Sequence, residues 1–178
     1  MSRRSGSGSP MKDMRQLEAM RVRLQAEDFD AAAESAALAR GRHDVGAVVT
    51  FTGICRGSDQ GEPVAAMTLE HYPGMAEAEI ARHVEEASRR WRLLGATVIH
   101  RHGRLVPGDN VVLVATAARH RQEAFAAAEF LMDYLKTRAP LWKREERASG
   151  ASWVAARDAD EEAARRWNAL PRRGEAAE

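Results

Sequence analysis

Segments with the residue pattern of strands alternate along this chain with segments that have the pattern of helices. The stretch 46–55, GAVVTFTGIC, is rich in β-branched residues and predicts a buried strand. Between residues 73 and 91 the apolar positions instead recur at spacings of four, three and four, which predicts an amphipathic helix. The positions concerned are Ile80, Val84, Ala87 and Trp91. Because no repeat or linker divides the chain, the sequence predicts a single domain of the α+β class.

The other elements are predicted in the same way. Strands are expected at 22–24, 64–72, 96–103 and 109–118, with the strand at 64–72 paired to the strand at 46–55. Helices are expected at 29–40, 122–138 and 158–168. In the helix at 122–138, the residues expected to face the core are Phe125, Ala128, Met132 and Leu135.

A proline separates the helix at 122–138 from the segment that follows it. Pro140 ends the helix, because the residue before a proline is pushed out of the α-helical region. The stretches LWKREE and SWVAA then lie on either side of Ser149 and Gly150, which predicts a β-hairpin. The chain is therefore expected to pass directly from a helix into a hairpin.

The charges of the chain are nearly balanced. Lysine and arginine total 27 against 26 aspartates and glutamates, so the formal net charge is +1. This balance counts against a nucleic-acid partner and directs attention to local clusters of charge. The single cysteine, Cys55, excludes an internal disulfide and a cysteine-based zinc site. No apolar run approaches the roughly 20 residues that a membrane-spanning helix needs.

The two ends of the chain differ from its middle in composition. Residues 1–20 are small and polar and are expected to form a mostly disordered extension. Arg3 and Arg4 are not followed by an apolar segment, so no secretion signal is predicted and the expected compartment is the cytoplasm. The domain is expected to span residues 21–170, and residues 171–178 form a polar tail.

The stretch 133–146, DYLKTRAPLWKREE, places basic residues on both sides of the proline. Cations favour the C-terminal end of a helix, which accounts for those before the proline but not for those after it. Lys136 lies on the last turn of the predicted helix and Lys143 on the following strand, so the bend at Pro140 can direct both toward one point. Clustered cations there would suit acid–base or nucleophilic chemistry. A basic surface rim is the alternative, and spacing alone does not decide between the two.

Two further places carry candidate anion-binding residues. Arg119, His120 and Arg121 come where the helix at 122–138 begins, and the N-terminus of a helix attracts anions. Arg56 follows an apolar strand, and binding residues often lie in the loops after strands. A solvated turn and an ordinary exposed arginine are the alternatives, and they remain open at this point.

Histidines and the cysteine are weaker candidates. His100 and His102 would lie on one face of a strand, as in some metal sites, but no clear third ligand accompanies them. A structural or hydrogen-bonding role is therefore preferred, and no metal site is predicted. Cys55 is expected to be a buried packing residue that lines the site. Glu70 and His71 could take part in acid–base catalysis, but polar residues are equally expected at the end of a strand.

Four segments together resemble one known family. GAVVTFTGICR, LEHYPGM, ARHR and above all MDYLKTRAPLWKRE are similar to the signature segments of the molybdopterin synthase catalytic (large) subunit family. The resemblance runs from about Val22 to Trp167, and the segment with the two lysines is its most specific part. The chain departs from the family pattern before residue 20, at Ile54 and Cys55, and around His102.

The resemblance implies a fold, a reaction and partners. The implied fold is an α/β hammerhead with an added antiparallel β subdomain. The enzyme is a sulfurtransferase that converts cyclic pyranopterin monophosphate into molybdopterin by installing the two sulfurs of a dithiolene. The sulfur arrives as the C-terminal Gly-Gly thiocarboxylate of a small ubiquitin-like subunit. Two catalytic subunits form a homodimer within a heterotetramer, and the resemblance implies no metal or other cofactor for this step.

The resemblance also assigns residues to the reaction. Lys136 and Lys143 match the catalytic lysines of the family, which also contact the substrate. Lys136 is expected beside the carbonyl of the partner's tail, where it would transfer a proton or stabilise an oxyanion. The remaining residues that the resemblance assigns to substrate binding are Ile54, Cys55, Arg56, His120, Arg121, Arg144 and Glu145. Arg56, His120 and Arg121 match the pocket for the substrate anion.

Two other classes of protein compete with the enzyme. A nucleic-acid module would use the basic cluster, but the net charge of +1 counts against it. A non-catalytic scaffold that binds a ubiquitin-like partner would use the same pocket. The presence of both Lys136 and Lys143 favours the enzyme over the scaffold.

Overall fold

The computed structural model describes residues 19–59, 61–147, 149–154 and 158–169. The predicted tail at 171–178 and all but the last two residues of the predicted extension at 1–20 lie outside these ranges. Within them the chain forms four helices and two sheets, as expected for the α+β class. No helix in these ranges is long and apolar enough to cross a membrane.

The first sheet has four strands in the order β1-β5-β7-β2. These strands are β1 (Met20–Gln25), β2 (Ala47–Ile54), β5 (Gly95–Arg101) and β7 (Asn110–Ala118). β1 pairs with β5 in parallel, whereas the pairs β5–β7 and β7–β2 are antiparallel. β5 and β7 occupy the middle of the sheet, and nearly all of their residues are buried, which agrees with their apolar sequences.

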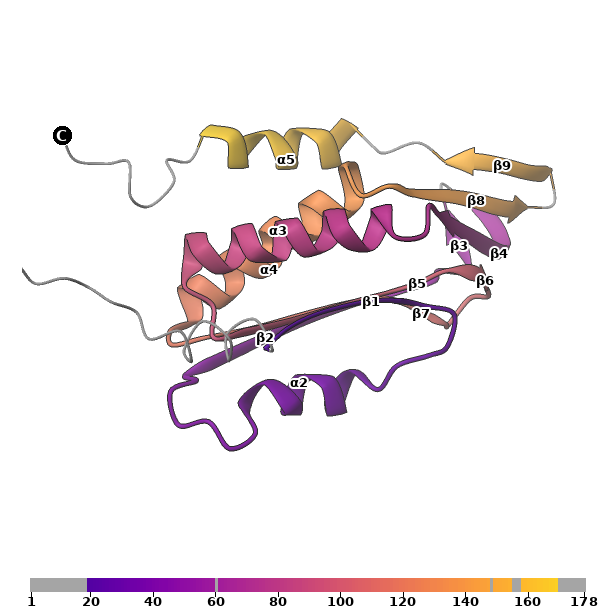
Figure 1. Ribbon diagram of the computed structural model, residues 1–178. Coiled ribbons are helices and arrows are strands. Elements are labelled where there is room, and N and C mark those ends of the chain that lie inside the picture. The colour runs from indigo at the N-terminus through magenta and orange to yellow at the C-terminus, as the bar shows by residue number, and fades with distance from the viewer. Residues whose placement is uncertain (1–18, 60, 148, 155–157, 170–178) are drawn as a thin grey trace, which may run out of the picture.

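Helices cover both faces of the first sheet (Figure 1). α2 (Ala31–Ala39) lies on one face, and the Asp30 side chain caps it by accepting a hydrogen bond of 2.9 Å from the Ala33 amide. α3 (Met75–Trp91) and α4 (Arg121–Thr137) lie side by side on the other face, and α5 (Asp158–Ala169) packs against α4. The main core forms between α3, α4, α5 and this face, and includes Ile80, Val84, Val114, Leu131 and Trp167.

The second sheet is antiparallel and lies at one end of the helices (Figure 1). Its strands are β3 (Ser58–Asp59), β4 (Glu62–His71), β6 (Gly103–Leu105), β8 (Leu141–Arg147) and β9 (Gly150–Val154). β4 pairs with β3, with β6 and with β8, and β8 continues into β9 as the predicted hairpin. This sheet corresponds to the antiparallel subdomain that the resemblance implies.

One predicted strand pairing is wrong. The strand at 64–72 was expected beside the strand at 46–55, but β4 pairs with β8, and β2 pairs with β7 along its whole length. Consecutive strands often pair, but the short β3 opens a separate hairpin with β4 directly after β2. The chain therefore leaves the first sheet between Ile54 and Ser58, and β4 becomes part of the second sheet.

The inward face of α4 is also corrected at one position. Phe125, expected in the core, is 61% exposed, whereas the neighbouring Ala124 is fully buried. Ala124 belongs to a stripe with Ala128, Leu131 and Leu135, which recur at spacings of four, three and four. The small alanine lets the helix lie close to the sheet, and the Thr116 hydroxyl on β7 donates a hydrogen bond of 2.8 Å to the Ala124 carbonyl.

Candidate functional site

A pocket of about 880 Å³ opens where the two sheets meet the end of α4. The lining comes from the end of β2 with the loop after it, the C-terminal end of α4, and β8, together with parts of β4, β5, β7 and β9. Of the residues predicted to form the site, those that line the pocket are Ile54, Cys55, Arg56, Lys136, Lys143 and Glu145. The pocket thus collects side chains that are separated by more than 80 positions in the sequence.

Lys136 and Lys143, on either side of the bend at Pro140, both line this pocket. α4 ends at Thr137, and the Arg138 amide closes its last turn with a hydrogen bond of 2.9 Å to the Tyr134 carbonyl. Pro140 follows, and β8 begins at the next residue. Because only three residues separate the helix from the strand, the two lysines are held by rigid elements on either side of a short turn.

Lys143 is paired with a buried carboxylate. Its Nζ atom lies 2.9 Å from Oε1 of Glu145, whose side chain is only 6% exposed. Burial alone would raise the pKa of Glu145, but hydrogen bonds from Lys143 and Arg147 outweigh this effect and hold the pKa below its ordinary value. Glu145 is therefore ionised at neutral pH and fixes the position of the Lys143 ammonium group.

Arg144 does not line the pocket, although it lies between these two residues. Successive side chains of a strand point to opposite faces, so Lys143 and Glu145 share one face of β8 and Arg144 lies on the other. Its backbone pairs with Thr68 on β4 and with Trp153 on β9. Arg144 is not among the residues that line the pocket, and its role in substrate binding stays a prediction.

Arg56 reaches the pocket from the loop after β2. Its guanidinium Nη2 lies 2.8 Å from Oδ1 of Asp59, and its side chain is 67% exposed. Ile54 is exposed at the pocket, whereas Cys55 is buried against Met67 and other apolar side chains. Burial raises the pKa of the Cys55 thiol, so the thiol is protonated at neutral pH, and Cys55 is a packing residue as predicted.

His100 belongs to the pocket, although the sequence indicated only a structural role for it. Its ring is buried, and Nδ1–H donates a hydrogen bond of 2.8 Å to the Arg101 carbonyl. Burial lowers the pKa of His100 to about 4, so the ring is neutral at physiological pH. His102 instead packs against His71, with the ring centres 4.6 Å apart. In the described ranges, no group of three or more histidine, cysteine, aspartate or glutamate residues is arranged to hold a metal ion.

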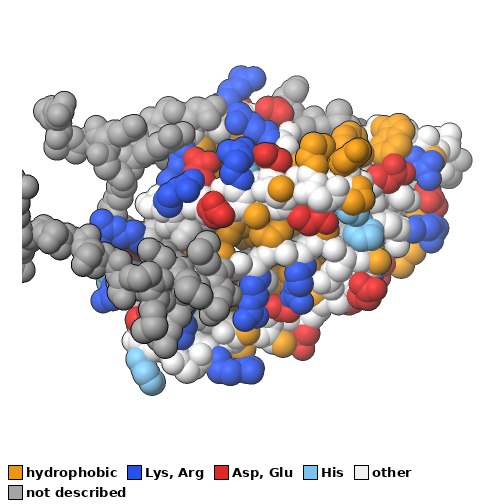
Figure 2. All heavy atoms as spheres, viewed as in Figure 1, with side chains coloured by type: hydrophobic (Ala, Val, Ile, Leu, Met, Phe, Trp, Pro, Cys, Tyr) orange, Lys and Arg blue, Asp and Glu red, His pale blue; other side chains and the backbone are white. Residues whose placement is uncertain are grey.

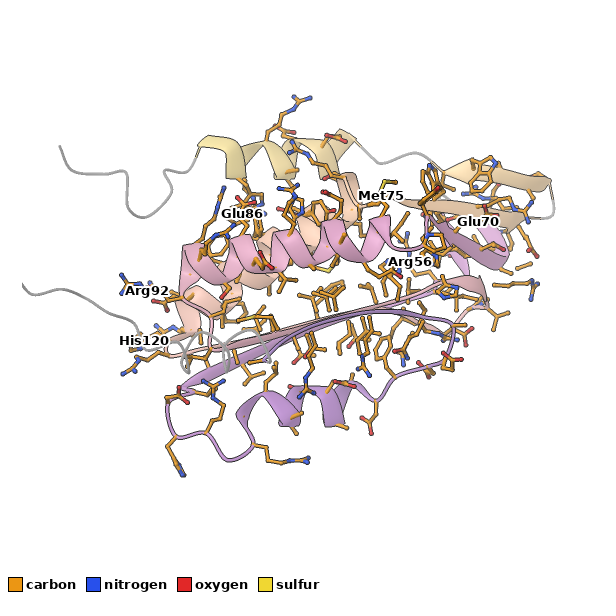
Figure 3. The ribbon with its side chains drawn as sticks, in the orientation of Figure 1. Arg56, Glu70, Met75, Glu86, Arg92 and His120 are labelled. Atoms are coloured by element: carbon orange, nitrogen blue, oxygen red, sulfur yellow. The ribbon has the colours of Figure 1, made fainter. Side chains whose placement is uncertain are left out.

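His120 and Arg121 lie far from this pocket in the same chain. They occupy the N-terminal end of α4, are exposed, and do not line the pocket. Figure 3 shows His120 at one end of the molecule and Arg56 well away from it, toward the second sheet. Arg121 precedes Lys136 by 15 positions on one helix, which separates their backbones by roughly 22 Å at about 1.5 Å per residue. Within one chain, therefore, His120 and Arg121 do not share a pocket with Arg56. Their roles in anion binding stay predictions.

Exposed hydrophobic side chains gather near the pocket. Figure 2 shows them over the start of α3 and the hairpin of β8 and β9. The large hydrophobic residues exposed in this region are Tyr72, Met75, Trp142 and Trp153. Trp142 and Trp153 also line the pocket, at 49% and 58% exposure. An apolar surface next to a pocket is typical of a place where another molecule binds.

Asp59 and Arg147 are among the residues of the site that were missed in the sequence. Asp59 lines the pocket and is 6% exposed, and Arg147 lies behind it with contacts to both Asp59 and Glu145. Asp59 stands in a Gly/Ser-rich loop and Arg147 in a run of charged residues, where polar side chains are usually solvated. No local pattern distinguished them, because their burial depends on a contact between distant segments.

Comparison with known proteins places this fold in a family. The family described as MoaE protein matches residues 24–138. The molybdopterin synthase catalytic subunit of Mesorhizobium japonicum is 60% identical over 148 residues, which cover 82% of this chain and 92% of that protein. The corresponding subunit of Cereibacter sphaeroides is 59% identical over 148 residues, covering 83% of this chain and 100% of that protein.

A solved structure agrees with these sequence relatives. The molybdopterin biosynthesis MoaE protein from Burkholderia ambifaria is 47% identical and superposes with a TM-score of 0.71, covering 84% of this chain and 98% of that chain. On the sequence match, the relatives and this superposition, the chain belongs to the MoaE protein family.

Proposed function

We propose that this chain is the catalytic subunit of a molybdopterin synthase and acts as a sulfurtransferase. The observation that carries this proposal is that Lys136, Lys143 and Arg56 line one pocket, although they come from a helix, a strand and a loop. The relatives described above are catalytic subunits of this enzyme and are matched over nearly their whole length. The activity that their names state is therefore the one we assign to this pocket.

The charges of the pocket suit the proposed substrates. Cyclic pyranopterin monophosphate and a thiocarboxylate are both anions, and bringing them together requires fixed positive charge. Arg56 offers a planar guanidinium group that can bind phosphate oxygens in pairs, and it is exposed at the pocket. The precursor enters as substrate, and the proposed step uses no metal or other cofactor.

The two lysines have different surroundings and are assigned different roles. Lys136 is exposed and forms no ion pair with any residue in the described ranges, so its ammonium group is available to a substrate. We assign it to the carbonyl of the incoming tail, where it donates a proton or stabilises the oxyanion as sulfur leaves. Lys143, held by Glu145, positions the substrate anion.

The proposed partner is a small ubiquitin-like subunit with a C-terminal Gly-Gly. A tail that ends in two glycines is narrow, and we propose that it enters the pocket that Trp142 and Trp153 help to line, with its carboxyl end at the lysines. The exposed hydrophobic residues around the entrance then contact the body of the partner. This arrangement gives a function to the apolar surface in Figure 2.

The catalytic subunit is proposed to form a homodimer within a heterotetramer. His120 and Arg121 lie too far from Lys136 to share its pocket within one chain. In a homodimer, the N-terminal end of α4 in one copy can approach the pocket of the other copy. The predicted anion-binding role of these two residues therefore depends on the dimer.

Reconstitution with a defined partner tests the function. We expect the purified chain to form molybdopterin when it is mixed with the precursor and a thiocarboxylated ubiquitin-like subunit. The same subunit without its two terminal glycines should bind more weakly and transfer no sulfur. If the chain binds the intact partner but forms no product, the non-catalytic scaffold is the correct function. Transfer at an undiminished rate with the truncated partner would contradict the proposed use of the tail.

A further inference from the structure

Two buried carboxylates stand behind the cations of the pocket. Glu145 binds Lys143, with Oε1 2.9 Å from Nζ, and Asp59 binds Arg56, with Oδ1 2.8 Å from Nη2. The side chains of Glu145 and Asp59 are each 6% exposed. A buried carboxylate is costly unless its oxygens are paired, so both groups require further hydrogen-bond donors.

Arg147 supplies donors to both of these carboxylates. Its Nη2 lies 2.6 Å from Oε2 of Glu145 and 3.4 Å from Oδ2 of Asp59, and its Nε lies 3.1 Å from the same Glu145 oxygen. The remaining terminal nitrogen, Nη1, lies 3.0 Å from Oε2 of Glu62 at the surface. The Arg147 side chain is 16% exposed, so its contacts with Glu145 and Asp59 are largely shielded from water.

These contacts form a continuous network of ion pairs behind the pocket. It runs from Lys143 through Glu145, Arg147 and Asp59 to Arg56, and it joins β8 to the loop after β2. Arg147 does not line the pocket, so it acts through the two carboxylates. The planar guanidinium group fixes the angle between its partners, which a lysine ammonium group would not do.

We propose that Arg147 is a positioning residue of this enzyme, which sets Lys143 and Arg56 in a fixed relation to each other by holding Glu145 and Asp59. This inference rests on the proposed function, because Lys143 and Arg56 are there assigned to the substrate anions. Without Arg147, Glu145 and Asp59 lose their common partner, and the two cations move independently. The phosphate of the precursor then meets a less ordered pair of cations.

A purely structural role for Arg147 is the competing explanation. Its contact with Glu62 also ties β8 to the β3–β4 hairpin, and any ion pair across a sheet can do the same. Arg104 provides a matched control, because it pairs with Glu146 at 3.1 Å across the same sheet and lies outside the pocket. A substitution of Arg104 removes an ion pair across the sheet but leaves the network of ion pairs behind the pocket intact.

The first measurement compares Arg147→Met with Arg104→Met in the reconstituted sulfur transfer. Arg147→Met is expected to raise the KM for the precursor roughly 10-fold or more, with a smaller change in kcat, whereas Arg104→Met leaves both constants near those of the wild type. In a Lys143→Ala background, Arg147→Met should have a much smaller effect, because the two residues act through one network. Full additivity of the two changes, or equal kinetics for Arg147→Met and Arg104→Met, would overturn the proposal.

The second measurement does not depend on activity. The side-chain carboxyl carbon of Glu145 is followed by NMR as a function of pH, and its titration is expected to shift to higher pH in Arg147→Met, since a donor is lost. An unchanged Glu145 titration would overturn the network even if the enzyme proved inactive. If circular dichroism shows that Arg147→Met is unfolded, Arg147→Lys is measured in its place. Arg147→Lys keeps the positive charge but lacks the planar guanidinium group, so it too should raise the KM for the precursor. A wild-type chain that forms no molybdopterin would refute the proposed function while leaving this titration measurable.

Discussion

Lys143 and Glu145 lie on the same face of β8, and the Lys143 Nζ is 2.9 Å from the Glu145 Oε1. Lys136 lines the same pocket, but no described residue forms an ion pair with it. The pocket therefore holds one lysine whose charge is compensated by a buried carboxylate and one whose charge is available. Substitutions at the two lysines should have different consequences.

Replacing Lys136 should abolish most activity without affecting the fold. Because Lys136 is exposed, Lys136→Ala and Lys136→Arg should fold, dimerise and bind the partner like the wild type. Both should slow sulfur transfer by about 100-fold or more if this lysine acts as an acid or a base. Single-turnover transfer measures the effect, and the exposed Arg138→Ala, which removes a cation two positions away and outside the pocket, is the control. A wild-type rate in well-folded Lys136→Ala would exclude this lysine from the mechanism.

Replacing Lys143 should reduce both stability and substrate binding. Lys143→Ala leaves Glu145 buried with Arg147 as its main partner, which should lower the free energy of unfolding by about 1–2 kcal/mol. Denaturation with urea measures this loss. Lys143→Ala with Glu145→Gln should recover part of the stability, because the buried charge is then also removed, but it should not recover activity. If Lys143→Ala has the same free energy of unfolding as the wild type, the ion pair between Lys143 and Glu145 does not stabilise the fold.

Of the anion-binding residues, Arg56 should act in the pocket of its own chain and Arg121 in the pocket of the second copy. Arg56→Ala and Arg121→Ala should each weaken binding of the precursor by about 1.5–3 kcal/mol, the usual loss for a charged hydrogen bond. Isothermal titration measures the affinity. If Arg121 serves the pocket of the second copy, co-expression of Arg121→Ala with Lys136→Ala chains should restore activity, because each mixed dimer contains one intact pocket.

The mixing experiment has a clear negative outcome. If Arg121 served the pocket of its own chain, no mixed dimer would contain an intact pocket and activity would stay lost. At equal amounts of the two chains, roughly a quarter of all pockets should be intact in the first case. A mixture of Arg56→Ala with Lys136→Ala chains is the matched control, since both residues line the same pocket and no recovery is expected.

His100 should make the fold less stable in acid. The folded chain binds a proton at His100 only near pH 4, because burial lowers the pKa from 6.5 to about 4. The unfolded chain binds that proton near pH 6.5, so stability from His100 is present above pH 6.5 and is lost as the pH falls toward 4, by about 3 kcal/mol in total. Urea denaturation at about pH 7 and about pH 4.5 should show a larger acid-induced loss in the wild type than in His100→Asn.

Two other histidines have to be considered when the acid-induced loss of stability is compared between the wild type and His100→Asn. Burial also lowers the pKa of His83, but that residue contributes equally to the wild type and the variant. His43 is exposed, so His43→Asn serves as the control for replacing a histidine that is not part of the core. If His100→Asn loses as much stability in acid as the wild type does, His100 is not the group responsible.

Much of this protein followed from its sequence alone. The helix that ends before Pro140, the hairpin after it and the core stripe through Ile80, Val84 and Ala87 were all correctly predicted, because each depends on residues that are close in the chain. The family resemblance, carried by contiguous segments, then assigned the two lysines. The short turn between a helix and a strand left little freedom in how those lysines were placed.

The tertiary structure decided which distant segments meet. Pairing of β4 with β8, and not with β2, is what places Glu145 and Lys143 opposite Met67 and Leu69 at the pocket. The separation of Arg121 from Lys136 follows from the length and direction of α4, and the link from Arg147 to Asp59 crosses 88 positions of the chain. Alternating patterns specify which face of a strand is buried but not which strand lies beside it. That choice depends on hydrogen bonds and burial summed over the whole fold, and the burial of Asp59, Glu145 and His100 depends on it as well.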